Sequence, residues 1–473
     1  MKQAMSREKN LAKNTVIIAM GTLLPRISSF ITLPLLTGCL TKSEYGYLDI
    51  IGTLTSLLLP VATLRIEAAA FRYLLEARND GESENKIVSS MLAFVLIASS
   101  LALLIFVLIP TSFPKEIKAI VCCYIFLSNL VTVFQQILRG FSKNSIYSGS
   151  AILHSLSTVI FLLIFVGKLS LGLKGVMLSY IISLSITIIG IIIAGKIYRR
   201  ISIKSISIES IKRLLSYSWP MVPNSLSLWV MNLSDRLLIS HYLGTEYNGV
   251  YAVSNKIPSL YSSLEGTFVL AWQENASLAS KDEDSTNYYS EMFQNIFDLL
   301  VILIAVIIVF TPVVFALFIK GDYSEAYPQM PILFVAMFFS SLSSFLGGIY
   351  VALMKTKNVA VTTFIAAFVN LLVDFCLIRF IGLYAASIST FISYAFLALY
   401  RMNDVKKYIS IHYNYKRVAI GISGIIVLCI VMHFRTLWGN ILNALFATAF
   451  CILFDKEIIA KSYIIIRKKL LKK

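Results

Sequence analysis

The sequence predicts an all-α protein that crosses a membrane about fourteen times, as two six-helix lobes followed by two further helices. The first observation is composition: 57% of the 473 residues are hydrophobic and only 14% are charged, whereas a soluble domain has roughly 45–50% apolar and 25% charged residues. The second is segmentation, because a hydrocarbon core about 30 Å thick needs roughly 20 apolar helical residues per crossing. The third is a weak internal repeat.

The expected spans are joined by short connections, so no sizeable domain outside the membrane is predicted. Between the sixth and seventh spans, Ile208, Ile211 and Leu215 recur at helical spacing, which predicts an amphipathic helix on the inner membrane surface. The approximate bounds of the spans are 14–36, 48–68, 87–109, 117–138, 147–167, 171–195, 214–235, 249–271, 294–318, 329–354, 358–380, 382–400, 416–434 and 437–454.

Two pairs of segments carry the repeat. The stretches "GLKGVMLSYIIS" (172–183) and "GLYAASISTFIS" (382–393) share Gly, Leu, Ser, Ile and Ser at an offset of 210, and "LTKSEYGY" (40–47) echoes "LGTEYNGVY" (243–251). Because six is an even number of crossings, both copies would enter the membrane in the same direction and be related by an axis along its normal.

The repeat defines the expected domains. Residues 1–213 form an N-terminal lobe with the inner-surface segment, 214–402 form a C-terminal lobe, and 403–473 hold the last two spans and a basic tail. A binding cavity between the two lobes follows from this arrangement.

The net charge of +17 is explained by topology and does not predict nucleic acid as a partner. With the N-terminus in the cytoplasm, about 31 of the 42 Lys and Arg lie on the inner side and about 9 outside. The remaining two, Arg26 and Lys256, lie within the membrane. Both termini are therefore expected in the cytoplasm.

Arg26 and Lys256 are the candidate ligands for an anionic substrate. Arg26 lies roughly 18 Å into the first span, near the midplane, on a face shared with Ser29 and Thr37. Its insertion costs about 2.5–3.5 kcal/mol, so it should face protein or a water-filled cavity. Lys256 lies roughly 10 Å from the outer end of the eighth span. No equal number of carboxylates is evident at the midplane, which favours an anion; structural ion pairing is the alternative.

Two intramembrane carboxylates, Asp374 and Glu265, are candidates for ion coupling. For both a structural role is the preferred interpretation, because Arg379 follows Asp374 by about one turn and Glu265 points about 180° away from Lys256. The six cysteines lack metal or redox spacing, so neither a metal nor a cofactor is predicted.

Near the inner end of the second span, Arg65 and Arg72 are seven residues apart on one helical face, with Glu76 four residues beyond Arg72. A mouth that receives phosphate and an ordinary surface ion pair both fit this pattern. His154 in the fifth span is expected to be hydrogen-bonded inside the bundle.

At this point the sequence resembles a known family. The segments "AKNTVIIAMGTLLPRISSFITLPLLTGCLTKSEYGYLDI" (12–50), "FRYLLE" (71–76) and "LLSYSWPMVPNSLSLWVMNLSDRLLISHYLGTEYNGVYAVSNKIP" (214–258) are similar to bacterial polysaccharide flippases of the Wzx type. That family belongs to the superfamily of multidrug and toxin extruders and the lipid II flippase. The resemblance spans roughly residues 8–400.

The resemblance implies a protein of the bacterial cytoplasmic membrane that is not an enzyme. It would flip undecaprenyl-diphosphate-linked oligosaccharide units by alternating access, for a surface polysaccharide such as O-antigen, capsule or lipopolysaccharide. Arg26 and Lys256 match the kind of cavity cations that the lipid II flippase uses, and the last two spans would help form a groove for the lipid tail. Its partners would be membrane lipid, a polysaccharide polymerase and a chain-length regulator.

Three other functions remain open. A drug or cation extruder of the same fold would favour carboxylates and aromatic residues in the cavity. A polysaccharide polymerase would need a large outer loop for its catalytic site, and none is predicted. A membrane scaffold would have no use for Arg26.

Overall fold

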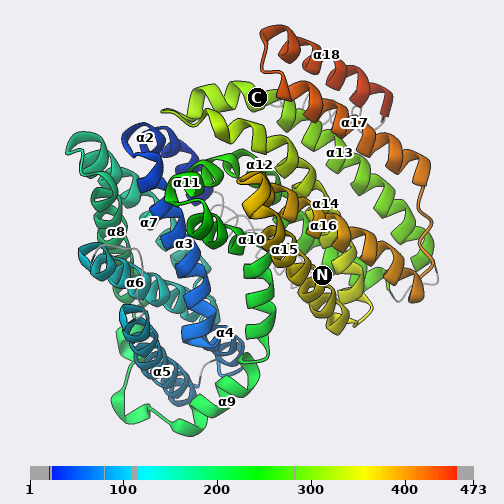
Figure 1. The fold of residues 1–473 in the computed structure, drawn as a ribbon. Helices are drawn as coiled ribbons and strands as arrows, with labels where there is room; N and C mark the ends of the chain where they lie inside the picture. Colours follow the sequence, from blue (N-terminus) through cyan, green and yellow to red (C-terminus); the bar gives the residue numbers. More distant parts are fainter. Residues whose placement is uncertain (1–20, 22–23, 79, 109–114, 281–283, 455–473) are drawn as a thin grey trace, which may run out of the picture. The chain divides into compact units, whose positions relative to one another are not determined.

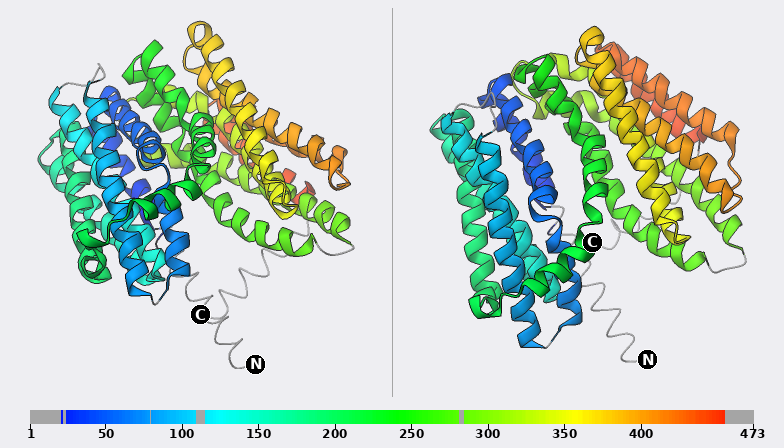
Figure 2. Two further views of the ribbon diagram at one scale, coloured as in Figure 1. Left: turned by 90° about the horizontal axis from the view of Figure 1, so that it is seen from below. Right: turned by 60° about the horizontal axis from the view of Figure 1, so that its bottom comes forward.

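The computed structural model describes residues 21, 24–78, 80–108, 115–280 and 284–454, and within these ranges the regular structure is helical and no strand occurs. The predicted all-α class is therefore confirmed. The chain divides into two compact units, Met1–Trp229 and Val230–Lys473, and α10 (Met221–Tyr242) runs across the boundary between them. Figures 1 and 2 show the helices of each unit.

The first unit is a bundle of long helices with one short helix, α9, laid across α4 and α5. A π-helical turn, η1 (Leu163–Lys168), extends α7, and two 3₁₀ turns, η2 (Ile197–Arg200) and η3 (Ile203–Ser205), lead into α9. The helices are α2 (Leu33–Cys39), α3 (Lys42–Thr63), α4 (Ile66–Glu76), α5 (Gly81–Leu108), α6 (Lys115–Gly140), α7 (Asn144–Leu162), α8 (Gly172–Gly195) and α9 (Ile208–Ser218).

The second unit is built around α14, which is the most buried of the apolar helices that the structure describes. The last two helices pack on α13, as Figure 1 shows. The helices are α11 (Thr245–Ser254), α12 (Lys256–Ala279), α13 (Ser285–Phe318), α14 (Met330–Ala352), α15 (Thr356–Ile381), α16 (Tyr384–Asp404), α17 (Tyr415–His433) and α18 (Leu437–Phe454), with 3₁₀ turns η4 (Ser324–Gln329) and η5 (Val405–Lys407).

The two units repeat one internal packing pattern. In the first unit α8 packs against α6 and α7, and α6 packs against α4; in the second, α16 packs against α14 and α15, and α14 packs against α12. These helices are the second, fourth, fifth and sixth of each expected set of six. The repeated packing supports the duplication predicted from sequence.

The glycine of the repeated Gly-Leu pair has a positive φ in both units. Gly172 has φ 55° and Gly382 has φ 57°, in the left-handed region where a residue without Cβ is favoured. Each glycine lies where the chain turns into the last helix of its six. The shared glycine therefore has a conformational cause.

Ten of the described helices are long and apolar enough to cross a membrane. The other four expected spans fall on helical segments that are shorter or more polar: residues 24–39, α10, α11 with α12, and α16. The described part of every expected span thus coincides with helix, and the number of crossings remains a prediction of about fourteen.

The expected second span is broken between α3 and α4. Leu64 and Arg65 have φ 48° and 60°, a conformation that costs an ordinary residue roughly 1–2 kcal/mol. Two hydrogen bonds hold the break: the Ser218 hydroxyl of α9 donates to the Leu64 carbonyl (2.8 Å), and the Thr63 hydroxyl donates to the Glu67 carboxylate (2.9 Å).

Candidate functional site

Arg26 lies on the helical segment 24–31, and its side chain is exposed. Ser29 on the same face is also exposed, whereas Thr37 is buried and donates its hydroxyl within its own helix. The helix is interrupted at Thr32, at the start of α2. The expected polar face therefore holds for Arg26 and Ser29 but does not continue to Thr37.

A cavity of about 260 Å³ lies beside this segment inside the first unit. Ser28 and Ser29 line it from one side, and α7 lines it with His154, Ser155 and Thr158. His154 bonds the backbone of Ser183, but its Nδ1 and the hydroxyls of Ser155 and Thr158 are buried without a hydrogen-bond partner among the described residues. Such atoms are stabilised by a hydroxyl-bearing ligand or by water.

Arg65 and Arg72 pair with different carboxylates. Arg65 precedes α4 in the left-handed conformation and pairs with buried Glu67 at 3.5 Å. Arg72 lies within α4 and pairs with Glu76 at 3.0 Å, with both side chains about half exposed. Arg72 thus has the surface ion pair that was the alternative.

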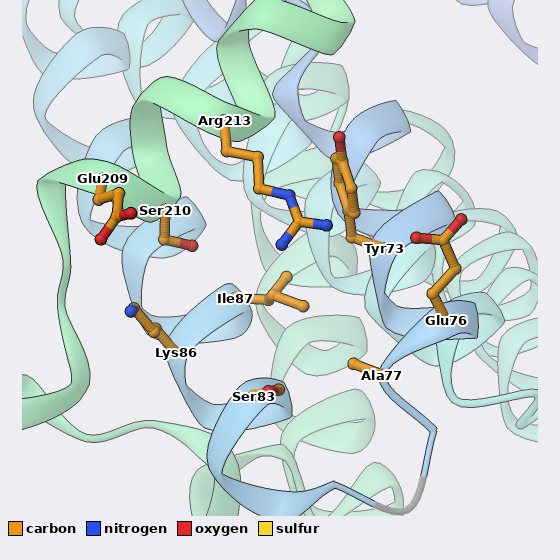
Figure 3. A pocket seen from close by; sticks show the side chains of 9 residues that line it. All are labelled: Tyr73, Glu76, Ala77, Ser83, Lys86, Ile87, Glu209, Ser210 and Arg213. Carbon is orange, nitrogen blue, oxygen red and sulfur yellow. The ribbon is translucent and has the colours of Figure 1, made fainter.

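A pocket of about 360 Å³ lies where α9 crosses α4 and α5 (Figure 3). The Arg213 guanidinium lies 4.3 Å from the centroid of the Tyr73 ring. Two carboxylates, Glu76 and Glu209, balance the two cations Lys86 and Arg213 around the pocket. Because its charge is balanced, this pocket is a poor receptor for a diphosphate.

Lys256 is the first residue of α12 and is half-buried. The sequence predicts one continuous span over 249–271, but α11 ends at Ser254 and the helix is interrupted at Asn255. The Ser259 hydroxyl donates to the Lys256 carbonyl (2.8 Å), which is the first turn of the new helix. Lys256 therefore lies directly after a one-residue interruption at Asn255, whose own backbone stays in the helical region.

Asp374 lies in the middle of α15 and is fully buried. Neither carboxylate oxygen has a hydrogen-bond partner among the described residues. The interpretation that it pairs with Arg379 is wrong, because the Arg379 guanidinium instead lies 5.1 Å from the centroid of the Tyr242 ring. A buried carboxyl without a donor is unfavourable when charged, so it must take up a proton or bind a cation.

Asp235 on α10 is the functional candidate that the sequence prediction missed. It is 4% exposed, accepts a hydrogen bond from the Tyr251 hydroxyl and lies 3.5 Å from Arg236. Asp374 lies within electrostatic range of Asp235, and both carboxyls are buried in the second unit. The sequence signal was the pair "DR" (235–236), which the expected span 214–235 placed at its end, whereas α10 runs from Met221 to Tyr242.

Polar contacts join the helices around this carboxyl pair. The Ser234 hydroxyl lies 3.5 Å from the Asn370 side-chain oxygen, and the Asn370 amide lies 3.5 Å from the Ser393 hydroxyl. The Tyr394 hydroxyl donates to the Asn232 side chain (2.6 Å). Helices α10, α15 and α16 therefore meet at a polar layer within an otherwise apolar bundle.

The carboxyl pair corrects one premise of the sequence analysis. Asp235 and Asp374 are two of the four buried carboxylates described in the second unit, with Asp298 and Asp404, so positive charge does not dominate the interior of the described chain. The side chain of the other coupling candidate, Glu265, is outside the described part of α12. Within the described ranges, no group of three or more His, Cys, Asp and Glu is placed to hold a metal ion.

Comparisons with known sequences identify the chain's relatives. The family described as "Polysaccharide biosynthesis protein" matches residues 11–272, more than half of the chain. An uncharacterized membrane protein of Methanocaldococcus jannaschii is 25% identical over 339 residues, which cover 68% of this chain. The chain spans 66% of that relative's length.

Two groups of solved structures share the fold. The lipid II flippase MurJ in an inward closed conformation aligns with a TM-score of 0.71 and 15% identity, over 95% of this chain and all of its own. A multidrug resistance MATE family transporter in an inward-facing conformation aligns with a TM-score of 0.67 and 13% identity, over 83% of this chain and 98% of its own. At these identities the likeness establishes the fold.

Proposed function

The chain belongs to the polysaccharide biosynthesis protein family, and from that membership we propose that it is a flippase for lipid-linked oligosaccharides. Its substrate is an undecaprenyl-diphosphate-linked repeat unit, moved from the inner to the outer leaflet of a bacterial cytoplasmic membrane by alternating access. The family match over residues 11–272 is the observation that carries the proposal. The fold shared with the lipid II flippase over 95% of the chain supports it.

The polar groups of the first unit suit the two polar parts of such a substrate. Arg26 presents an exposed guanidinium, whose planar fork can bind phosphate oxygens through two hydrogen bonds. The cavity beside it offers His154 Nδ1 and the hydroxyls of Ser155 and Thr158, which can exchange hydrogen bonds with sugar hydroxyls. Lys256 supplies the cation of the second unit. The prenyl tail stays in lipid and needs no polar contact.

The carboxyls of Asp235 and Asp374 are the proposed coupling site. Arg236 compensates the charge of Asp235, whereas neither oxygen of Asp374 has a hydrogen-bond partner among the described residues, so a charged Asp374 needs a bound cation and is otherwise protonated. Binding or release of a proton or a monovalent cation at Asp374 changes the charge of this polar layer, where α10, α15 and α16 meet. A gradient of that cation across the membrane can thereby drive the change between the two access states, which substrate binding alone would not drive.

One observation favours a second function. A buried carboxyl pair is also what a cation-coupled drug extruder requires, and the chain shares its fold with a MATE family transporter. Such a protein would confer drug resistance, whereas a flippase would be required for a surface polymer.

Deletion of the gene separates the two functions. The expected result is lipid-linked oligosaccharide retained in the inner leaflet and loss of the polymer outside, both restored by the wild-type gene. Drug susceptibility should not change. Unchanged polymer in a strain with no redundant flippase, together with increased drug susceptibility, would reject the flippase and establish the extruder.

A further inference from the structure

A third pocket of the first unit, about 520 Å³ in volume and called the basic pocket below, has a large excess of positive charge. It lies among the connections α4–α5 and α6–α7 and the segment after α8, at the end of the unit where α9 also packs. By the expected topology all three connections face the cytoplasm. The charged groups that line it are Arg78, Lys143, Lys196, Arg199, Arg200 and a single carboxylate, Glu84.

The single carboxylate is already engaged. Arg200 pairs with buried Glu84 at 2.9 Å. Arg78 bonds the Ser142 hydroxyl, and Arg199 lies 5.7 Å from the centroid of the Tyr198 ring. Within the described part of the chain, no carboxylate pairs with these two arginines. The cations of the pocket therefore greatly outnumber its anions.

The frame of the pocket is fixed by hydrogen bonds between elements. The Lys143 amine donates to the Gly195 carbonyl at the end of α8 (2.6 Å). The Ser89 and Ser90 hydroxyls of α5 accept hydrogen bonds from the backbone N–H groups of Ser202 and Ser207, each at 2.9 Å. Because these bonds hold the connections in place, the cations are gathered before any ligand arrives.

The electrostatic effect of this crowding is visible at Lys143. Partial burial, together with the positive charges of Arg200 and Lys196, lowers the pKa of its amine below the usual range. Like charges held together in this way are relieved by a bound anion.

We propose that this pocket binds the phosphate of an anionic phospholipid in the adjacent leaflet. Arg199 and Lys196, both exposed at its rim, receive the phosphate, and the lipid's apolar part can follow the helices into the membrane. Phe141 and Leu74 line the same pocket, and the cations Lys143 and Arg200 lie 5.5 and 6.0 Å from the Phe141 ring centroid. Basic pockets between transmembrane helices on the cytoplasmic side are suited to such headgroups.

The balanced pocket of Figure 3 shows that position alone does not create this charge. It lies at the same end of the unit, yet its two cations face two carboxylates. Selectivity for an anionic lipid is therefore assigned to the basic pocket and not to the whole basic surface.

The test uses the purified full-length protein in detergent, with unfolding temperature measured against added lipid. The probes are dioleoylphosphatidylglycerol, dioleoylphosphatidylcholine and inorganic phosphate. Phosphatidylglycerol should raise the unfolding temperature of the wild type more than phosphatidylcholine. Removing two charges with Lys196→Gln/Arg199→Gln should raise the half-saturating concentration of phosphatidylglycerol by roughly tenfold or more.

The matched control is Lys204→Gln/Lys212→Gln, which removes two exposed charges outside the pocket and should leave the half-saturating concentration unchanged. If the first double variant unfolds without lipid, Arg199→Gln alone replaces it, because the Arg199 side chain is exposed and lies against the ring of its neighbour Tyr198. Equal loss in both double variants, or equal stabilisation by the two lipids, would overturn the proposal. Stabilisation by inorganic phosphate as large as by phosphatidylglycerol would overturn the lipid assignment and leave a soluble phosphate as ligand.

Discussion

Arg26 combines an exposed side chain with a position near the middle of the first expected span. Arg26→Ala should leave the protein abundant in the membrane, because the change relieves an insertion cost of about 2.5–3.5 kcal/mol, and should remove most transport. Arg26→Lys keeps the charge but loses two-point binding of phosphate, so partial transport is expected. Surface polymer and membrane abundance, measured together, check both outcomes.

The matched control is Arg72→Ala. Arg72 forms an exposed ion pair with Glu76, a contact worth roughly 0–1 kcal/mol, so its removal should change neither readout by much. An Arg26→Ala protein that is abundant and transports normally would refute the diphosphate role. One that disappears from the membrane would indicate that Arg26 balances a buried carboxylate.

Asp374 gives the sharper separation of stability from function. Asp374→Asn preserves shape and removes the ionisable group, and no hydrogen bond from the described residues is lost. The unfolding temperature of Asp374→Asn should equal or exceed that of the wild type, while transport stops.

Asp235→Asn weakens the contacts of this side chain with Tyr251 and Arg236, so this variant should be less stable than the wild type. Thermal unfolding of purified protein and a transport assay test the pair; normal transport by Asp374→Asn would place the coupling site elsewhere.

At the scale of helices, the two repeated glycines differ in what surrounds them. Alanine at either position suffers a positive φ, and at Gly382 the ψ of −132° adds a conformation that is essentially open only to glycine. A Cβ at Gly382 meets nothing within 4 Å, whereas one at Gly172 collides with the Glu44 carboxylate. That carboxylate also accepts the Leu173 N–H at the start of α8 (3.1 Å).

Both variants should therefore have a lower unfolding temperature than the wild type. In Gly172→Ala the Glu44 side chain must also move away, and the Leu173 N–H at the start of α8 then loses its acceptor. Calorimetry or fluorescence-detected unfolding of the two variants measures both losses. A wild-type unfolding temperature in either variant would contradict the requirement for glycine at that position.

The helices were predictable because apolar run length and helix length are set by the same bilayer. The expected span 171–195 matches α8 (Gly172–Gly195) almost residue for residue. The break at Leu64–Arg65 was not predictable, because neither residue is proline or glycine and a tertiary contact, the Ser218 bond to the Leu64 carbonyl, holds it. The interruption at Asn255 had a sequence signal that was missed, since Pro258 has no N–H to bond the Ser254 carbonyl. Of the carboxyl pair, Asp374 was predicted and Asp235 was not. The expected span ended at residue 235, seven residues before α10 ends at Tyr242, so Asp235 was assigned to a span boundary although it lies inside the helix.

At the scale of the whole molecule, the prediction concerns topology, that is, the side of the membrane that each connection faces. The distribution of Lys and Arg predicts this topology, and the positions of the helices alone do not test it. In a chain without native cysteines, Ser205→Cys should resist an impermeant thiol reagent in intact cells and react after permeabilisation, because its basic surroundings are retained in the cytoplasm. Ser324→Cys in η4, which is exposed, should react in intact cells. Labelling of Ser205→Cys without permeabilisation would contradict the predicted orientation.

The break at Leu64–Arg65 ties an inner-surface helix to the bend of a span. The backbone at Leu64 and Arg65 is already outside the helical hydrogen-bond ladder, so changing the angle there breaks few further bonds. Ser218 at the end of α9 holds the Leu64 carbonyl, while Leu214 and Ser218 anchor α9 in the unit. The position of α9 is therefore coupled to the bend between α3 and α4. If α9 lies in the headgroup layer as expected, lateral tension that displaces it should change the angle of the second span at Leu64–Arg65.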